Sequence, residues 1–219
     1  MHWNSCEGCG HVFTDGYFTE EACQLIFGKT HDHQKVGGDL EKNRIVSARM
    51  IEKVLPYASE GHWLDVGFGN GSLLFTAQEF GFSPIGIDLR ADTVRVMNEL
   101  GITAYQRGVT DLALDEPCAV ISMADVLEHI PFPKLALEAA NRLLRPGGVL
   151  LISMPNSENV LWTAMTAQDV NPYWGEIEHY HNFSRTRLYS LLQEFGFAPR
   201  RYGISERYRV CMEVVALKL

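Results

Sequence analysis

The chain has 219 residues, of which 46% are hydrophobic and 21% are charged, and its formal net charge is −8 at pH 7. That length suits one α/β domain with a full core and a short N-terminal addition. The acidic balance argues against nucleic-acid binding, because such proteins gain affinity from a basic surface that releases counterions. No apolar run reaches the length of a membrane span, and the first residues lack the charged and apolar regions of a secretory signal. We therefore expect a cytoplasmic protein.

After the first 41 residues, strands and helices alternate along the chain. Apolar residues at helical spacing predict a helix over 40–58. Beyond it, short apolar runs bounded by glycine and proline predict strands, and the periodic segments between them predict helices. The expected strands are 62–66, 83–88, 102–106, 117–123, 149–154, 197–204 and 208–219. The later expected helices are 72–80, 91–100, 133–144 and 184–195.

This order of elements predicts the fold class: α/β, with a doubly wound, seven-stranded, mostly parallel sheet. Strands that alternate with helices form parallel sheets through right-handed crossovers. The last two strands are joined by a short turn, so one of them must run antiparallel. We expect residues 1–41 to form an irregular lobe and linker that contain Cys and His, and residues 42–219 to form the main domain. Residues 155–182 form a long aromatic insertion, and a loop of that length usually has a functional reason.

Three glycines at alternate positions follow the first strand of the main domain. The run at 63–74 reads WLDVGFGNGSLL, with Gly67, Gly69 and Gly71 between the strand and the next helix. Glycines let the backbone approach a ligand closely, and a helix N-terminus offers free N–H groups. Asp88 ends the following strand, about 20 residues on, where an acid accepts the hydroxyls of a ribose. The pattern predicts a nucleotide-type ligand, and the G-x-G-x-G spacing argues against a dinucleotide pyrophosphate.

This stretch resembles motif I and the following acidic loop of class I S-adenosylmethionine-dependent methyltransferases. The segments AVISMADVLEHI at 119–130 and RLLRPGGVLLISMP at 142–155 resemble the fourth and fifth strands of that family. The segments EHYHNFS at 178–184 and LLQEFGF at 191–197 resemble a subgroup with ubiquinone-pathway O-methyltransferases and sugar or surface-glycan methyltransferases. The similarity covers residues 42–219, and its segments stand in the family's order.

The resemblance implies S-adenosylmethionine as the cofactor, with its methionine part beside the glycine loop and its ribose on Asp88. The family often has an acidic residue for the adenine amino group, and Gly108 stands at that position here. Either the backbone at Val109 or Thr110 contacts the adenine edge, or Asp111 reaches it. The positions assigned to the cofactor are Asp65, Gly67, Gly69, Gly71, Asp88, Leu89, Val109, Thr110, Asp111, Met123, Ala124 and Asp125.

Three histidines are the catalytic candidates. His129 follows the fourth strand and is either a satisfied, partly buried histidine or a general base, since histidine titrates near neutral pH. His179 and His181 alternate along an extended segment, so their side chains should point the same way. They would contact the substrate, make structural hydrogen bonds or form a metal pair. Because two ligands alone make no metal site, we assign no metal to them.

Cys6 and Cys9 resemble the second half of a zinc ribbon that precedes some sugar methyltransferases. The chain has five cysteines, and an odd number argues against a disulfide framework. A tetrahedral zinc site needs four ligands, so the alternative is a reduced pair of thiols. The other candidate ligands in this segment are His11, Cys23, His31 and His33.

These features predict an enzyme that positions an activated methyl donor against an acceptor and excludes water, for which no catalytic triad is needed. We expect O-methylation of a small molecule, sugar or glycan or lipid precursor by a monomer or homodimer. Trp162, Tyr173 and Trp174 would either fill the core or form the wall of an acceptor pocket. One alternative is a nicotinamide-dependent oxidoreductase, which the third glycine and the lack of a second domain disfavour. The other is a homologue that binds the cofactor without turnover.

Overall fold

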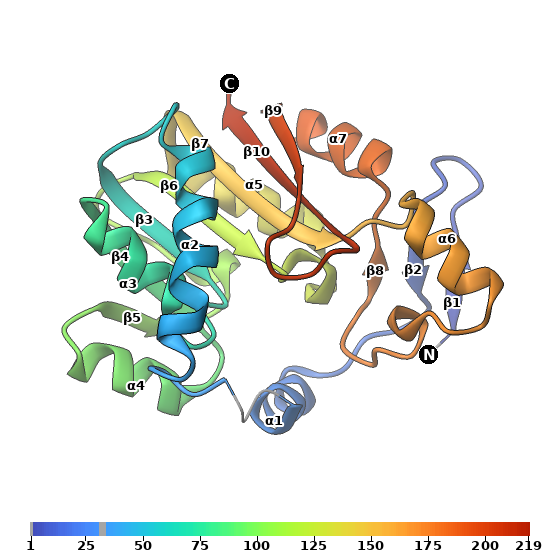
Figure 1. Cartoon of the computed structure of the whole chain (residues 1–219), viewed down its shortest axis with the longest axis horizontal. Helices are drawn as coiled ribbons and strands as arrows, with labels where there is room; N and C mark the ends of the chain where they lie inside the picture. Colours follow the sequence, from blue (N-terminus) through green and yellow to red (C-terminus); the bar gives the residue numbers. More distant parts are fainter. Residues whose placement is uncertain (1, 31–33) are drawn as a thin grey trace.

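A seven-stranded β-sheet forms the centre of the molecule (Figure 1). The computed structural model describes residues 2–30 and 34–219. The strand order is β5-β4-β3-β6-β7-β10-β9. Strand β10 pairs antiparallel with β7 and β9, whereas the other pairs are parallel, which confirms the predicted fold class. The bounds are β3 Gly61–Val66, β4 Phe82–Asp88, β5 Thr103–Gln106, β6 Cys118–Ala124, β7 Leu144–Pro155, β9 Phe197–Ile204 and β10 Cys211–Lys218.

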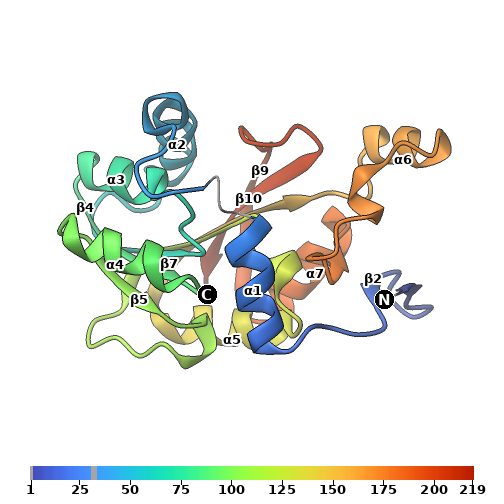
Figure 2. The same ribbon diagram turned by 90° about the horizontal axis from the view of Figure 1, so that it is seen from below.

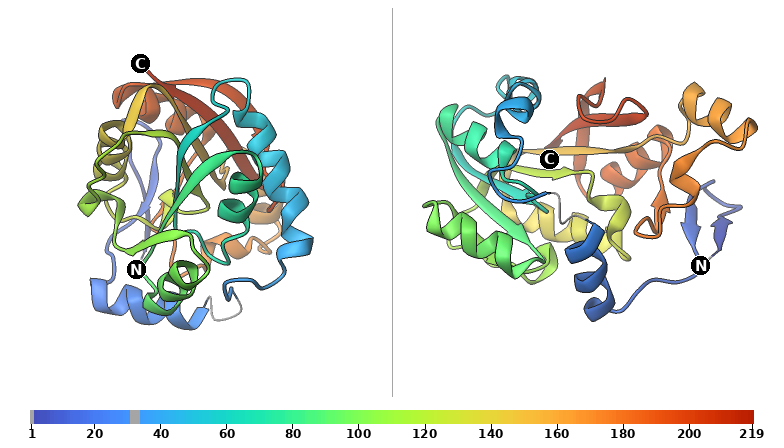
Figure 3. Two further views of the ribbon diagram at one scale, coloured as in Figure 1. Left: turned by 90° about the vertical axis from the view of Figure 1, so that its left-hand side faces the viewer. Right: turned by 60° about the horizontal axis from the view of Figure 1, so that its bottom comes forward.

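Helices cover both faces of this sheet (Figures 1 and 3). Helices α2, α3 and α4 pack on one face and α5 and α7 on the other, so the central strands are apolar on both sides. In the described ranges, no helix is long and apolar enough to cross a membrane. The bounds are α2 Leu40–Val54, α3 Ser72–Glu79, α4 Ala91–Glu99, α5 Pro133–Leu143 and α7 Arg185–Glu194, with 3-10 helices η1 Val109–Asp111 and η2 Leu127–His129.

The two largest differences from the expected element boundaries have local reasons. Helix α2 ends at Val54, short of residue 58, because Pro56 has no N–H to continue the hydrogen-bond ladder. Strand β7 begins at Leu144 and includes the expected turn at 145–148. A Cβ on Gly148 would lie 2.8 Å from the Arg145 carbonyl oxygen, so the chain can follow this path only with glycine there.

The N-terminal segment and the insertion are more regular than expected, because they pair with each other. Strands β1 (Trp3–Ser5) and β2 (Val12–Thr14) pair antiparallel, and β2 also pairs with β8 (His181–Asn182) from the insertion. These three strands form a second, small sheet. Helix α1 (Glu20–Thr30) follows β2, and the insertion contains α6 (Val160–Ala167) and the 3-10 helix η3 (Pro172–Trp174). Such pairing joins segments far apart in sequence, which local patterns do not encode.

Tyr180 is the main contact between these two segments. Its backbone oxygen accepts a hydrogen bond from Thr14 N at 3.0 Å, and its hydroxyl accepts one from Phe18 N at 3.3 Å. At the far end of the small sheet, Trp3 Nε1 donates to the Trp174 carbonyl over 3.0 Å. Helix α1 lies between the main sheet and the small sheet (Figure 2).

Candidate functional site

The glycine loop connects β3 to α3 at the carboxyl end of the parallel strands. Gly67, Gly69 and Gly71 have φ angles of 67°, 58° and 82°, in the left-handed region that other residues rarely adopt. Gly67 N donates to the Ile87 carbonyl over 2.7 Å, which fixes the loop beside the end of β4. A Cβ on Gly71 would lie 2.9 Å from the Phe75 ring, so the start of α3 leaves no room for a side chain.

Asp88 faces this loop from the end of β4. One of its carboxylate oxygens lies 3.4 Å from Gly69 N, and the residue is 7% exposed. Arg90 donates to both oxygens, from Nε to Oδ1 over 3.0 Å and from Nη2 to Oδ2 over 2.8 Å. A ribose bound to Asp88 must therefore take at least one oxygen from this bidentate pair. Leu89 between them is half-buried, and its carbonyl accepts from Gln106 Nε2 over 3.1 Å.

Asp65 is held beneath the loop by a buried polar relay. Trp63 Nε1 donates to Ser122 Oγ over 2.8 Å, and Ser122 Oγ donates to Asp65 Oδ1 over 2.6 Å. Burial raises the pKa of the Asp65 carboxyl to about 6, despite this hydrogen bond and the charge of Arg207. A carboxyl with this pKa gains or loses a proton readily near neutral pH, and the hydrogen bond from Ser122 fixes the orientation of the Asp65 side chain.

The segment expected near the adenine forms the 3-10 helix η1. Val109 is 3% exposed and packs in the core, whereas Thr110 and Asp111 are exposed. The Cβ position of Gly108 lies 3.8 Å from Asp111 Oδ2, so this carboxylate is close to the position at which the family has its acid. Both alternatives for contact with the adenine remain compatible with this arrangement.

The end of β6 holds Asp125 in an uncommon backbone conformation. Its φ angle is 60°, and a non-glycine residue in this region often marks a functional site. Ser153 Oγ donates to Asp125 Oδ1 over 2.9 Å, and Arg207 Nη1 lies 3.7 Å from Oδ2. The preceding residues, Met123 and Ala124, are buried. This places a carboxylate at the crevice where ligands bind in open α/β sheets.

His129 and His179 meet in a cluster with Glu128. The three potential ligand atoms all lie within 4.8 Å of one another, and the two imidazole centroids are 4.6 Å apart. Glu128 is 1% exposed, and its Oε2 has no hydrogen-bond partner; Nδ1 of His179 has none either. Burial raises the pKa of Glu128 well above its ordinary value and lowers that of His179 to about 3. Glu128 and His129 lie on η2, shortly after the end of β6, whereas His179 comes from the insertion.

His181 does not join His179, contrary to the expectation that the two side chains share a side. Its Nε2 lies 3.2 Å from the Pro131 carbonyl oxygen, and its Nδ1 lies 3.0 Å from Nε2 of His11. Pairing of β8 with β2 directs this imidazole toward the N-terminal strands. His181 therefore belongs to the contact between the N-terminal strands and the insertion.

Cys6 and Cys9 lie in a tight turn between β1 and β2. Hydrogen bonds from the Cys9 and Gly8 backbone lower the pKa of the Cys6 thiol. In the part of the chain that the structure describes, no group of three clustered potential ligands includes either cysteine. His31 and His33, two other candidate ligands, lie outside the described residues.

The aromatic residues of the insertion form a continuous row that reaches His179. The Trp162 and Tyr173 ring centroids are 5.3 Å apart, and Trp162 and Trp174 are 5.4 Å apart. Tyr173 stacks on His179 at 6.2 Å, and Trp3 contacts Trp174 at 5.6 Å. The row therefore connects the N-terminal strands to the cluster at the end of β6.

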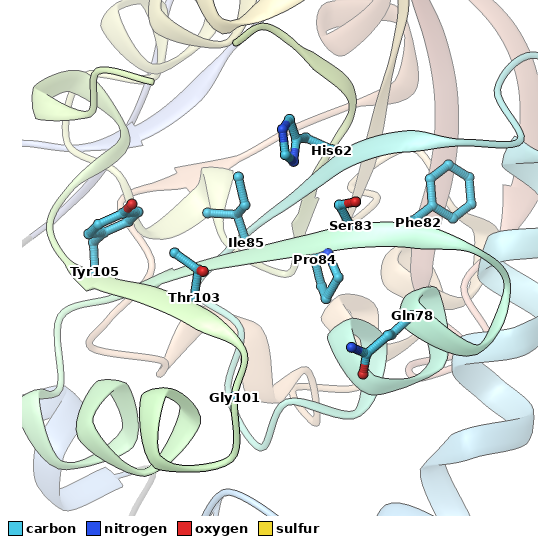
Figure 4. A pocket seen from close by; sticks show the side chains of 9 residues that line it. All are labelled: His62, Gln78, Phe82, Ser83, Pro84, Ile85, Gly101, Thr103 and Tyr105. Carbon is cyan, nitrogen blue, oxygen red and sulfur yellow. The ribbon is translucent and has the colours of Figure 1, made fainter. Parts of the chain in front are cut away.

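A surface cavity lies elsewhere, at the amino ends of β4 and β5 (Figure 4). Its volume is about 420 Å³, and its wall includes His62, Gln78, Pro84 and Tyr105. No group of clustered ligands or strained residues lies there among the described residues. Parallel sheets bind ligands at the opposite, carboxyl ends of their strands, so we place the site at the glycine loop.

A family model described as a methyltransferase domain matches residues 41–201. The chain belongs to this family. A ubiquinone biosynthesis O-methyltransferase of Xanthomonas euvesicatoria pv. vesicatoria is 35% identical over 101 residues, which are 42% of this chain and 42% of that protein. The chain thus matches less than half the length of this curated relative.

Solved methyltransferase structures share the fold across almost the whole chain. The 1,6-didemethyltoxoflavin-N1-methyltransferase of Burkholderia thailandensis, solved with S-adenosylhomocysteine, has a TM-score of 0.67 at 19% identity and covers 100% of this chain and 99% of its own. The magnesium protoporphyrin IX methyltransferase of Synechocystis PCC 6803, also solved with S-adenosylhomocysteine, has a TM-score of 0.66 at 16% identity and covers 91% and 99%. At these identities the likeness shows the fold.

Three residues close to this candidate site could not be placed there from the sequence. Arg90 follows Asp88 by two residues, and only the structure shows that it folds back onto the carboxylate. Arg207 comes from the β9–β10 connection and reaches the crevice through the antiparallel register of that hairpin. Glu128 precedes His129 in the chain, and only the structure shows that it is buried and that its Oε2 has no hydrogen-bond partner.

Proposed function

We propose that this protein transfers the methyl group of S-adenosylmethionine to an oxygen atom of a small molecule, sugar or glycan or lipid precursor. The observation that carries the proposal is the placement of the glycine loop. Its three glycines are left-handed, and Gly69 N and the Asp88 carboxylate are 3.4 Å apart at the carboxyl ends of neighbouring parallel strands. This geometry suits a ligand with an amino-acid part and a ribose.

The reaction requires little chemistry from the protein. The acceptor oxygen attacks the methyl carbon, the carbon–sulfur bond breaks, and the products are a methyl ether and S-adenosylhomocysteine, with the hydroxyl proton lost to a base or to water. Because the sulfonium is already activated, the protein contributes mainly orientation and exclusion of water. Asp65, Gly67 and Gly69 would contact the methionine part, and Asp88 the ribose.

The acceptor would enter from the side of the insertion. Tyr173 of the insertion stacks on His179 with ring centroids 6.2 Å apart, and the Phe27 ring of α1 lies 5.8 Å from the His129 ring. Residues 1–41 and 155–182 together would therefore set the acceptor specificity of the main domain, residues 42–219. The 35% identity to an O-methyltransferase supports oxygen as the acceptor atom.

Among the three histidines, His129 and His179 are the ones that would face the acceptor. Burial holds the pKa of His179 at about 3, so this imidazole stays neutral and is a weak base. The Nδ1 of His129 lies 3.0 Å from the Glu178 carbonyl oxygen, which favours a proton on Nδ1 in the neutral ring, so Nε2 is the nitrogen that would accept the acceptor's proton. His181 would support the site from the small sheet.

The test combines equilibrium binding with turnover. Calorimetry should show one site for S-adenosylhomocysteine and none for NAD, and labelled S-adenosylmethionine should methylate at least one acceptor in a panel of phenols, catechols and sugar alcohols. Binding of NAD in preference to S-adenosylhomocysteine would support an oxidoreductase instead. Binding without transfer to any acceptor would identify a homologue that keeps the ligand site without turnover.

A further inference from the structure

We propose that Glu128, His129 and His179 bind one divalent first-row transition metal ion, of the zinc or manganese type, at the acceptor side of the methyltransferase crevice. The set has two imidazoles and one carboxylate. Three protein ligands of this kind leave a coordination position open, as in metal sites that activate a bound oxygen. The metal site does not depend on the proposed methyl transfer, although it lies beside it.

The state of Glu128 is the first observation. This carboxyl is 1% exposed, and one of its oxygens has no hydrogen-bond partner. A buried ionised carboxylate without a partner is very unfavourable, so it must either take up a proton or bind a cation.

The two histidines supply the second, independent observation. His179 is 7% exposed, and its Nδ1 has no hydrogen-bond partner although it is buried. Burial keeps this imidazole neutral, which is the form that binds metals. The Nδ1 of His129 lies 3.0 Å from the Glu178 carbonyl oxygen, and a contact of this type orients a metal-binding imidazole so that Nε2 is the ligand.

The spacing of these groups also fits an ion. Their ligand atoms lie within 4.8 Å of one another. Ligands at about 2.1 Å from a zinc ion are about 3.4 Å apart in a tetrahedral arrangement, so small side-chain rotations suffice. The segments that carry them are already joined, because Tyr180 N donates to the Glu128 carbonyl over 2.9 Å.

A metal here would give the acceptor oxygen a place to bind. An oxygen on a divalent cation loses its proton far more readily than in water, and the ion holds it in a fixed direction. This would explain why a site beside a methyl donor contains a buried carboxylate with one unpartnered oxygen close to a buried imidazole nitrogen that also lacks a partner.

The experiment is a zinc titration of chelator-treated protein, followed by calorimetry, in a Cys6→Ser, Cys9→Ser background so that the thiol pair does not compete. We expect one bound ion per chain, a rise of Tm with zinc, and manganese binding at the same site. Glu128→Gln keeps the shape of the side chain and should weaken zinc affinity at least about 100-fold. The matched control Glu176→Gln, an exposed acid of the insertion that carries His179, should leave affinity unchanged.

Two outcomes would overturn the proposal: absence of stoichiometric zinc or manganese binding, or equal affinity in Glu128→Gln and its parent. Tm of Glu128→Gln without metal reports folding separately, and it should not fall, because the change removes a buried ionisable group. S-adenosylhomocysteine affinity, measured on the same samples, reports the proposed function. Zinc binding without S-adenosylhomocysteine binding would uphold the metal site and reject the methyltransferase cofactor.

Discussion

The cofactor side and the acceptor side of this molecule are built in different ways. On the cofactor side, the parts proposed to contact the methionine and the ribose follow one another in the chain: β3, the glycine loop, α3, β4 and Asp88 lie within residues 61–88. On the acceptor side, β2, η2, β8 and the β9–β10 connection come from four distant parts of the chain. The cofactor side is therefore specified by local sequence, whereas the acceptor side exists only once the chain has folded.

The largest effect should come from the glycine loop. Gly67→Val places a β-branched side chain at a φ of 67°, with its Cβ 3.0 Å from Val126 Cγ2, at the point of closest approach to the ligand. We expect S-adenosylhomocysteine affinity to fall at least about 100-fold. The control is Gly101→Val, which has a similar φ of 82° and nothing within 4 Å of its Cβ. Equal affinities in the two variants would mean that the loop is only a turn.

The same contrast explains what could be predicted from sequence. The doubly wound sheet, the glycine loop and Asp88 follow from short-range periodicity and from glycine spacing, which local physics determines. The small sheet could not be predicted, because β2 and β8 have two to three residues each and pair across most of the chain. For the same reason, the separation of His179 from His181 and the approach of Arg207 to Asp125 became visible only in the fold.

Asp88→Ala should have the next largest effect. Losing a charged acceptor for the ribose hydroxyls should cost about 1.5–3 kcal/mol, or roughly 10- to 150-fold in affinity. In the unsubstituted protein the Arg90 guanidinium pairs with both Asp88 oxygens, and the change removes this partner. Calorimetry with S-adenosylhomocysteine measures the loss. Asp92→Ala, an acid at the start of α4 whose side chain is 96% exposed, should bind normally.

Asp65→Asn should change stability in a pH-dependent manner. The folded-state pKa of Asp65 is about 6, against 3.8 as its ordinary value, so the folded protein loses stability as pH rises between these values. Asn carries no charge, and the variant should be more stable than the parent at pH 7, by on the order of 1–3 kcal/mol. Urea unfolding at pH 4 and pH 7 gives the comparison. A stability difference that does not change with pH would show that the buried carboxyl is not the cause.

The smallest effect concerns the acceptor side. Tyr180→Phe removes the hydroxyl that lies 3.3 Å from Phe18 N and 3.4 Å from Cys23 Sγ. The expected loss is about 0.5–1.5 kcal/mol, confined to the contact of the N-terminal segment. Hydrogen exchange should become faster over residues 18–27 and stay unchanged in β3 and β4. The half-exposed Tyr105→Phe serves as the control. Faster exchange throughout the main sheet would contradict the expectation that the N-terminal segment opens without the main sheet.

A crystal structure with S-adenosylhomocysteine tests the central claim most directly, because it shows where the ligand lies. We predict its ribose hydroxyls within hydrogen-bond distance of Asp88, its methionine part beside Gly67 and Gly69, and the Arg90 guanidinium displaced from at least one Asp88 oxygen. A ligand bound elsewhere, or bound while Arg90 still holds both oxygens of Asp88, would contradict the account.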